Sequence, residues 1–195
     1  DQAGFRRHFS TDDHLYTIAV IQETAHEWQI PVWTATIDFK KAFDSLNHSF
    51  IDSCLQALNF GPSFRNWVKL FLNDRATYLL MNGFMEERIE LQQGVPQGDI
   101  LSPLIFNIVV EFLLLKIGNS NHITGVFFPN VARLHNGESR VESYADDTTI
   151  GIQRDESKLR QLIKIINDFK MISGLSANLD KTHVIPCLLY TSPSP

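Results

Sequence analysis

Apolar residues return every three or four positions in five stretches of the chain, which is the spacing of one buried face of an α-helix. The first stretch follows Thr11, which we expect to cap a helix, and it stops before Pro31. The later stretches cover residues 51–58, 62–72, 104–117 and 159–172. Pro62 suits the first turn of a helix and Gly174 suits a helix end, so both mark boundaries. The pattern predicts five helices.

Strand-like patterns alternate with these helices. Residues 32–37 are β-branched and apolar, which favours a buried strand. Three further parts of the chain have strand character, namely residues 77–91, 123–152 and 182–185. Asn82-Gly83 and Asn136-Gly137 are the turn residues expected in tight hairpins. Helices and antiparallel hairpins in this order predict an α+β domain.

The stretch 104–117 is apolar on nearly every side, so we expect a helix inside the fold, capped by Ser102-Pro103. It is too short to span a bilayer, and it contains Asn107, Glu111 and Lys116. We therefore expect a core helix and no membrane partner.

Composition narrows the class of protein. The chain has 195 residues, 44% of them hydrophobic, which is enough for one good core. Its 22 acids outnumber its 17 Lys and Arg, giving a net charge of −5. This balance argues against a compact DNA-binding module but not against an enzyme whose centre needs carboxylates. Cys54 and Cys187 have no ligand spacing, so neither a disulfide scaffold nor a zinc site is expected.

Two groups of acids are candidates for metal chemistry. Asp38 stands where the strand 32–37 ends, and Asp146-Asp147 fall between strand-like residues, in the turn of a tight hairpin. Adjacent carboxylates repel each other, and a divalent cation such as magnesium would relieve that repulsion. If the strands are neighbours, the acids can hold two ions about 3.5–4 Å apart for phosphoryl transfer. Each group taken alone fits equally well a solvated turn or a helix cap.

Five segments, in order, resemble the motifs of reverse transcriptases of the LINE (non-LTR retrotransposon) type. They are Gln2–Arg6, Asp38–Asp44, Gly94–Asp99 with Leu101-Ser102-Pro103, Tyr144-Ala145-Asp146-Asp147, and Ser173-Gly174-Leu175 with Asn178 and Lys181. The Tyr-Ala-Asp-Asp (YADD) form is the signature of that family; Asp-Asp alone is a weak match, but five ordered matches are very specific. The resemblance covers residues 2–186.

The resemblance implies a polymerase palm, a ferredoxin-like antiparallel sheet backed by helices, with partial helical fingers. We expect residues 1–186 to form this reverse transcriptase domain, with the upstream fingers strands and the thumb belonging to a longer protein. Residues 187–195 differ from the regular segments before them. One choice of codons for them spells an end sequence that sequencing kits attach to DNA, so we expect a translated adapter or a disordered tail.

Residue roles also follow from the resemblance. Asp38 and Asp146 would bind both metal ions, Asp147 would support them, and the backbone carbonyl of Phe39 would face the nucleotide-bound ion. Lys181 would protonate or stabilise the leaving pyrophosphate, although a plain surface lysine fits as well. We expect the ions to be Mg²⁺, with Mn²⁺ able to substitute.

Nucleotide and template contacts come from the same comparison. The amides of Lys41 and Ala42 would receive the triphosphate, because we expect a helix to begin there. Phe43, five residues after Asp38, would be the steric gate that excludes a 2′-hydroxyl, although a lone Phe is more often core. Gln97-Gly98 would touch the sugar, although an ordinary loop fits as well. Arg6 and Arg7 would contact template phosphates, although solvated surface arginines fit almost as well.

The function implied is that of an RNA-directed DNA polymerase, a nucleotidyltransferase with an RNA template, a DNA primer and deoxynucleoside triphosphates as partners. Without thumb and complete fingers, the 195 residues alone are expected to be inactive. The alternatives are a group II intron-type enzyme, an RNA-dependent RNA polymerase, and a non-catalytic RNA-binding palm relic. We expect an intracellular protein of nucleus or cytoplasm, with no targeting signal in this stretch. The sequence defines neither the element, the host, the endonuclease nor the oligomeric state.

Overall fold

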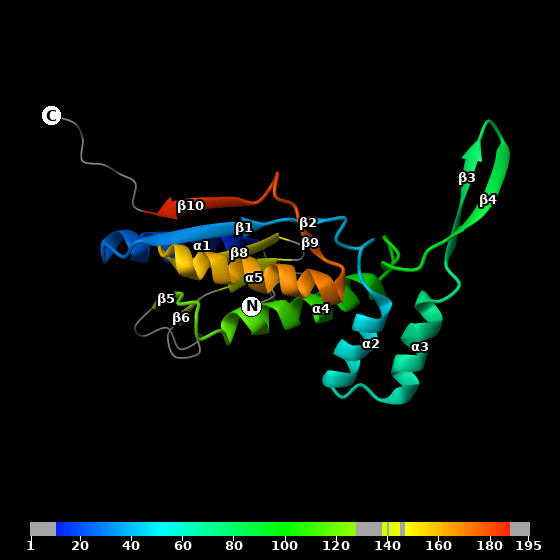
Figure 1. Ribbon diagram of the computed structural model, residues 1–195, viewed down its shortest axis with the longest axis horizontal. Helices are drawn as coiled ribbons and strands as arrows, with labels where there is room; N and C mark the ends of the chain where they lie inside the picture. The colour runs from blue at the N-terminus through cyan, green and yellow to red at the C-terminus, as the bar shows by residue number, and fades with distance from the viewer. Residues whose placement is uncertain (1–10, 128–137, 140, 145–146, 188–195) are drawn as a thin grey trace.

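The computed structural model describes residues 11–127, 138–139, 141–144 and 147–187. Its centre is a four-stranded antiparallel sheet with the strand order β10-β1-β8-β7 (Figure 1). These strands are β1 (Val32–Ile37), β7 (Val141–Tyr144), β8 (Asp147–Gln153) and β10 (His183–Cys187). When these four strands are numbered 1 to 4 by their order along the chain, their order across the sheet is 4-1-3-2. This is the strand order of a ferredoxin-like sheet. The predicted palm fold is confirmed.

Helices cover both faces of this sheet. On one face, Ala35 and Ile37 of β1 join a core with α2 (His48–Ala57), α4 (Leu101–Gly118) and α5 (Glu156–Ser173). On the other face, Val32 packs with Ile21 and Ala25 of α1 (Thr11–Glu27). Because successive residues of a strand point to opposite faces, the buried residues of β1 contribute to both layers. The fold is therefore helix, sheet and helix in three layers.

Helix α4 is the centre of the larger core. By length and composition its 18 residues could cross a membrane, so our argument that the apolar run is too short was wrong. Its packing explains its apolar character instead, because Phe106, Val109, Val110, Leu113 and Ile117 are fully buried against α2, α5 and the sheet. The prediction of a core helix is confirmed for this buried face, whereas Leu104 and Leu115 are 46% and 47% exposed.

The N-terminal cap of α4 differs from the one we expected. The carboxylate of Asp99 accepts hydrogen bonds from the amides of Leu101 (2.7 Å) and Ser102 (2.9 Å), and Ser102 Oγ donates to its other oxygen. Ser102 thus lies inside the helix and supports the cap rather than forming it. Burial, which raises the pKa of the Asp99 carboxyl, is outweighed by the hydrogen bonds from Ser102 and Leu101, so the pKa is lowered.

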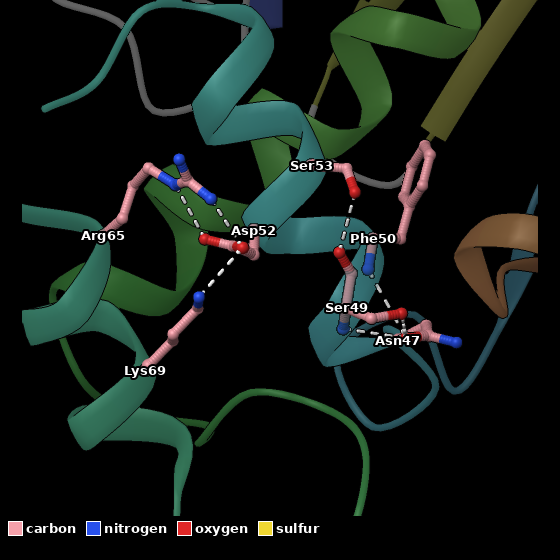
Figure 2. Close-up of polar contacts among 7 residues, drawn as sticks. All are labelled: Asn47, Ser49, Phe50, Asp52, Ser53, Arg65 and Lys69. Carbon is pink, nitrogen blue, oxygen red and sulfur yellow. Dashed lines mark hydrogen bonds and ion pairs between the residues drawn. The ribbon is translucent and has the colours of Figure 1, made fainter. Parts of the chain in front are cut away.

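Helices α2 and α3 (Pro62–Leu72) lie side by side and are joined by ion pairs (Figure 2). Arg65 donates Nε and Nη2 to the two carboxylate oxygens of Asp52 at 2.8 and 2.7 Å, and Lys69 lies 3.0 Å from Asp52 Oδ2. The hydrogen bond from Arg65, with that from Lys69, lowers the pKa of Asp52 to about 2 against the opposing effect of burial. Asn47 caps α2 by accepting from the amide of Ser49 (2.9 Å).

A hairpin of β3 (Ala76–Met81) and β4 (Phe84–Glu90) projects from the end of α3, away from the central sheet (Figure 1). Asn82 and Gly83 have φ angles of 51° and 83°, as a type I′ turn requires, so the predicted turn is confirmed. The remaining strands are short and pair two by two: β2 (Phe39–Lys40) with β9 (Ser176–Ala177), and β5 (Val126–Phe127) with β6 (Glu138–Ser139).

The second predicted hairpin turn and the predicted C-terminal tail both stay predictions. Asn136-Gly137 and the residues after Cys187 lie outside the described residues. Strand β10 ends at Cys187, where it pairs with Val32. The domain boundary that we expected at residue 186 therefore stays a prediction.

Candidate active site

Sheet register places two of the three predicted acids at the same edge. The last pair of the β1/β8 ladder is Ile37 with Thr148. Asp38 directly follows Ile37, and Asp147 directly precedes Thr148, so the two backbones meet where these antiparallel strands end. Asp147 pairs with Tyr144 as the first residue of β8, so it flanks the turn and does not lie within it as we expected. Asp146 lies outside the described residues, as does the side chain of Asp147.

Asp38 is held by two residues from the end of the chain. Asn178 donates Nδ2 to Asp38 Oδ2 at 3.0 Å, and its amide donates to the Asp38 carbonyl at 2.8 Å. Lys181 Nζ lies 3.8 Å from the same carboxylate oxygen, and its side chain is 70% exposed. Lys181 is therefore beside the predicted metal ligand. Asn178 was part of the recognised motif but had no predicted role, and its contact across 140 positions gives it one as a positioning residue.

The pairing of β2 with β9 brings these segments together. Phe39 is opposite Ala177 in the register, and Lys40 is opposite Ser176. The Phe39 ring is 4% exposed and belongs to the main core. The side chain of Phe39 therefore anchors β2 in the core. Its backbone carbonyl keeps the predicted role at the nucleotide-bound ion as a prediction.

The start of a helix at Lys41 and Ala42 is not observed. Lys41 adopts a positive φ of 47°, and its carbonyl accepts from the amides of Asp44 (2.9 Å) and Ser45 (3.0 Å). This closes a turn, and α2 begins only at His48. The prediction that these amides open a helix is wrong, because the left-handed backbone of Lys41 interrupts it. Lys41 itself is exposed and Ala42 is buried.

Phe43, the predicted gate, is half-buried and stacks on Phe106 of α4, with ring centroids 4.9 Å apart and an interplanar angle of 30°. Its carbonyl accepts from the amide of Val95 at 2.7 Å. Gln97 donates Nε2 to Asp44 Oδ1 at 3.1 Å. Gly98 has a φ of +93°, and nothing lies within 4 Å of where a Cβ would stand. The predicted gate and the predicted sugar-contact loop are thus joined, with open space at Gly98.

Two glycines pack closely against the segment 43–47. A Cβ on Gly94 (φ +81°) would lie 2.6 Å from the Asp44 carbonyl oxygen, and one on Gly174 (φ +83°) would lie closer still to that of Ser45. Backbone hydrogen bonds accompany both contacts, from Gly94 to Leu46 and from Asn47 to Ser173, each 2.8 Å long. Three of the predicted motifs therefore meet at one turn.

Not every predicted site residue can be placed. Arg6 and Arg7 lie outside the described residues. Within the described ranges, no group of three or more His, Cys, Asp or Glu side chains could hold a metal ion. Of the three predicted acids, only Asp38 has a described side chain, so the metal site stays a prediction.

The chain is similar in sequence to proteins of retrotransposable and mobile elements. The chain is 28% identical over 184 residues to the Pol polyprotein of the retrotransposable element R2DM of Drosophila melanogaster, covering 94% of this chain and 16% of that protein. It is 26% identical over 149 residues to the RNA-directed DNA polymerase of the mobile element jockey of Drosophila funebris, covering 76% and 15%. The chain therefore spans less than a fifth of the length of these two relatives.

A solved structure and a family model complete the comparison. Telomerase from Candida tropicalis, in complex with the TWJ fragment of telomeric RNA, superposes with a TM-score of 0.69 at 14% identity, covering 98% of this chain and 31% of that one. At that identity the likeness concerns the fold alone. The model of the family described as reverse transcriptase (RNA-dependent DNA polymerase) matches residues 1–190. The chain belongs to the reverse transcriptase family.

Proposed function

We propose that the protein to which this chain belongs is an RNA-directed DNA polymerase, which extends a DNA primer along an RNA template. Family membership and the non-LTR retrotransposon relatives support this function. The same relatives favour a retrotransposon enzyme over a group II intron-type enzyme or a non-catalytic palm. The single structural observation behind the proposal is the register of β1 and β8, in which Ile37 pairs with Thr148. That register puts Asp38 and Asp147 at one edge of the sheet.

Reverse transcriptases in general use divalent metal ions. The residues described at this edge fit such an ion. The Asp38 side chain is 22% exposed, and among the described residues no hydrogen bond to its Oδ1 is found. One oxygen is thus held by Asn178, while the other has no hydrogen bond from the part of the chain that the structure describes. We propose that Asp38, Asp146 and Asp147, with the Phe39 carbonyl, hold two Mg²⁺ ions. When bound, these ions would activate the primer hydroxyl and neutralise charge on the phosphates.

The residues of the chain perform the positioning. Asn178 fixes the Asp38 carboxylate through its side chain and the strand end through its amide. Phe43 presents a ring whose place is set by stacking on Phe106, which suits a gate beneath the sugar. Lys181 places an ammonium group at the same edge, where it could donate a proton to the departing pyrophosphate. We propose the backbone of Lys41 and Ala42 for the triphosphate and Gln97-Gly98 for the sugar.

The partners follow from the reaction. We propose an RNA template, a DNA primer and deoxynucleoside triphosphates as substrates, with Arg6 and Arg7 near the template. Since RNA templates and deoxynucleotides are found inside cells, we also propose that the protein acts there, in nucleus or cytoplasm.

Primer extension by the full-length protein tests the proposal. Asp38→Asn, Asp146→Asn and Asp147→Asn should each reduce incorporation of deoxynucleotides on an RNA template by several orders of magnitude, with unchanged thermal unfolding. Asp168→Asn is the matched control, because Asp168 is an exposed acid on α5 that belongs to none of the predicted motifs. Normal synthesis by the Asp38→Asn variant would refute the function.

A further inference from the structure

The carbonyl oxygen of Gly94 accepts two hydrogen bonds from side chains that no predicted role includes. His48 Nε2 lies 2.7 Å from it, and Arg75 Nη1 donates to it at 2.9 Å. Since a carbonyl oxygen only accepts, Nε2 of His48 must bear the hydrogen. His48 is the first residue of α2, and Arg75 directly precedes β3. The start of α2 and the start of the hairpin therefore both bind the carbonyl oxygen of Gly94.

Gly94 is a fixed point of the loop that contains Gln97 and Gly98. Its amide donates to the Leu46 carbonyl at 2.8 Å, and its α-carbon lies against the backbone of Asp44. With both His48 and Arg75 on its carbonyl, each polar group of this residue is engaged. The position of Gln97, three residues later, then depends on how firmly Gly94 is held.

Arg75 is bound to the loop rather than to the acids around it. The neighbouring acids Asp74 and Glu90 both pair with Arg88. Arg75 is half-buried, and its own carbonyl accepts from the amide of Leu91 at 2.8 Å, which closes the base of the hairpin. A hydrogen bond from a charged donor is stronger than one from a neutral donor. Its guanidinium is therefore a strong contact between the hairpin base and the loop.

We propose that Arg75 and His48 are positioning residues, which set the gap between the Gln97-Gly98 loop and the Phe43 ring and so the selection of deoxynucleotides over ribonucleotides. This inference rests on the proposed polymerase function. The Phe43 ring is held by stacking on the buried Phe106 ring, whereas Gln97 and Gly98 are exposed, so these two residues form the side of the gap that can move. Loss of either donor lets the loop shift, and the nucleotide then binds less tightly and less selectively.

The test uses the full-length protein and steady-state incorporation of single deoxy- and ribonucleotides. Arg75→Met removes the donors and keeps the aliphatic stem, and Arg75→Lys restores one charged donor. His48→Leu removes the donor, whereas His48→Gln places an amide nitrogen near the position of Nε2. Arg88→Met is the matched control, since Arg88 is the other arginine at the hairpin base and does not contact Gly94.

We expect Arg75→Met and His48→Leu to raise KM for deoxynucleotides on the order of 10-fold, the effect of losing one charged or buried hydrogen bond. The preference for deoxynucleotides should fall by a similar factor, while kcat changes less. Arg75→Lys and His48→Gln should recover most of both. A cavity of about 420 Å³ beside both side chains gives water room to replace them, so the variants should fold.

Three results separate the possible failures. An inactive wild-type protein would refute the polymerase function itself. Active variants of Arg75 and His48 with KM and selectivity equal to those of Arg88→Met would overturn the positioning role. A lower melting temperature with unchanged kinetics per folded molecule would also overturn it, because the two residues would then only stabilise the fold.

Discussion

Replacing Gly94 by alanine should destabilise the chain far more than the same change at Gly83. Both glycines have nearly the same backbone angle, φ +81° and φ +83°. At Gly83 nothing lies within 4 Å of an added Cβ, whereas at Gly94 the Cβ would lie 2.6 Å from the Asp44 oxygen and 2.8 Å from its carbonyl carbon. Both substitutions therefore carry the cost of placing alanine in the left-handed region. Only Gly94→Ala adds a steric clash with the Asp44 backbone.

The magnitudes follow from these two contributions. A non-glycine residue in the left-handed region costs on the order of 1–2 kcal/mol, which is the whole effect expected for Gly83→Ala. The collision at Gly94 involves backbone atoms that cannot rotate away, and overpacking of this kind adds roughly 1–3 kcal/mol. In a chain of this size each kcal/mol lowers the melting temperature by roughly 2–4 °C. Gly94→Ala should thus melt well below Gly83→Ala.

Thermal and urea unfolding of both variants, followed by circular dichroism, measure the difference. Urea curves give the free energy of unfolding and show through their slope whether the unfolded states are comparable. Equal stability of the two variants would show that the Gly94 backbone does not press against Asp44. The packing of the loop on the segment 43–47 would then be wrong.

Two further predictions concern charged groups. Asp52 has a pKa lowered from 3.8 to about 2 by Arg65, so its ion pair stabilises the fold above pH 4 and is lost as the pH falls to about 2. In pH-dependent urea unfolding, the stability advantage of wild type over Asp52→Asn should shrink by about 1–2 kcal/mol across that range, and a constant advantage would contradict the pairing. Asp99→Ala should cost about 1 kcal/mol by loss of the cap of α4. Asp99→Asn should retain most of this stability, and an equal loss in both variants would contradict the capping role.

The sequence pattern predicted the helices, strands and turns well because the residues within each of them determine its backbone conformation. The strand Val32–Ile37 was predicted with the bounds observed, and the Asn82-Gly83 turn has the backbone angles that those residues favour. The cap of α4 was missed for a local reason too. Ser102 fits the usual preference for a capping residue, but the helix begins earlier, at Leu101, and Asp99 accepts from the amides of Leu101 and Ser102. A preference for residue types cannot decide between two such neighbours.

The candidate site was predicted only as far as motifs identified it. The motifs identified Asp38, Phe43 and Gln97, yet nothing near Asp38 in the sequence indicates that Asn178 would hold it. The two donors to the Gly94 carbonyl were missed for the same reason, because His48 and Arg75 lie 46 and 19 positions away from it. Contacts of this kind depend on how the strands and helices pack, and no local pattern shows them.

The acid and the gate of the candidate site have separate supports, although they are five residues apart in one segment. Asp38 is fixed by the β1/β8 register and by Asn178. Phe43 is fixed by Phe106 and by the backbone bond from Val95. The turn between Asp38 and Phe43 is closed by hydrogen bonds to the Lys41 carbonyl. A shift of the Gln97-Gly98 loop therefore need not move the Asp38 carboxylate. Changes at the Gln97-Gly98 loop should alter which nucleotide is selected while the acids keep their places. Changes at Asn178 should displace the Asp38 carboxylate and leave the selection of the nucleotide unchanged.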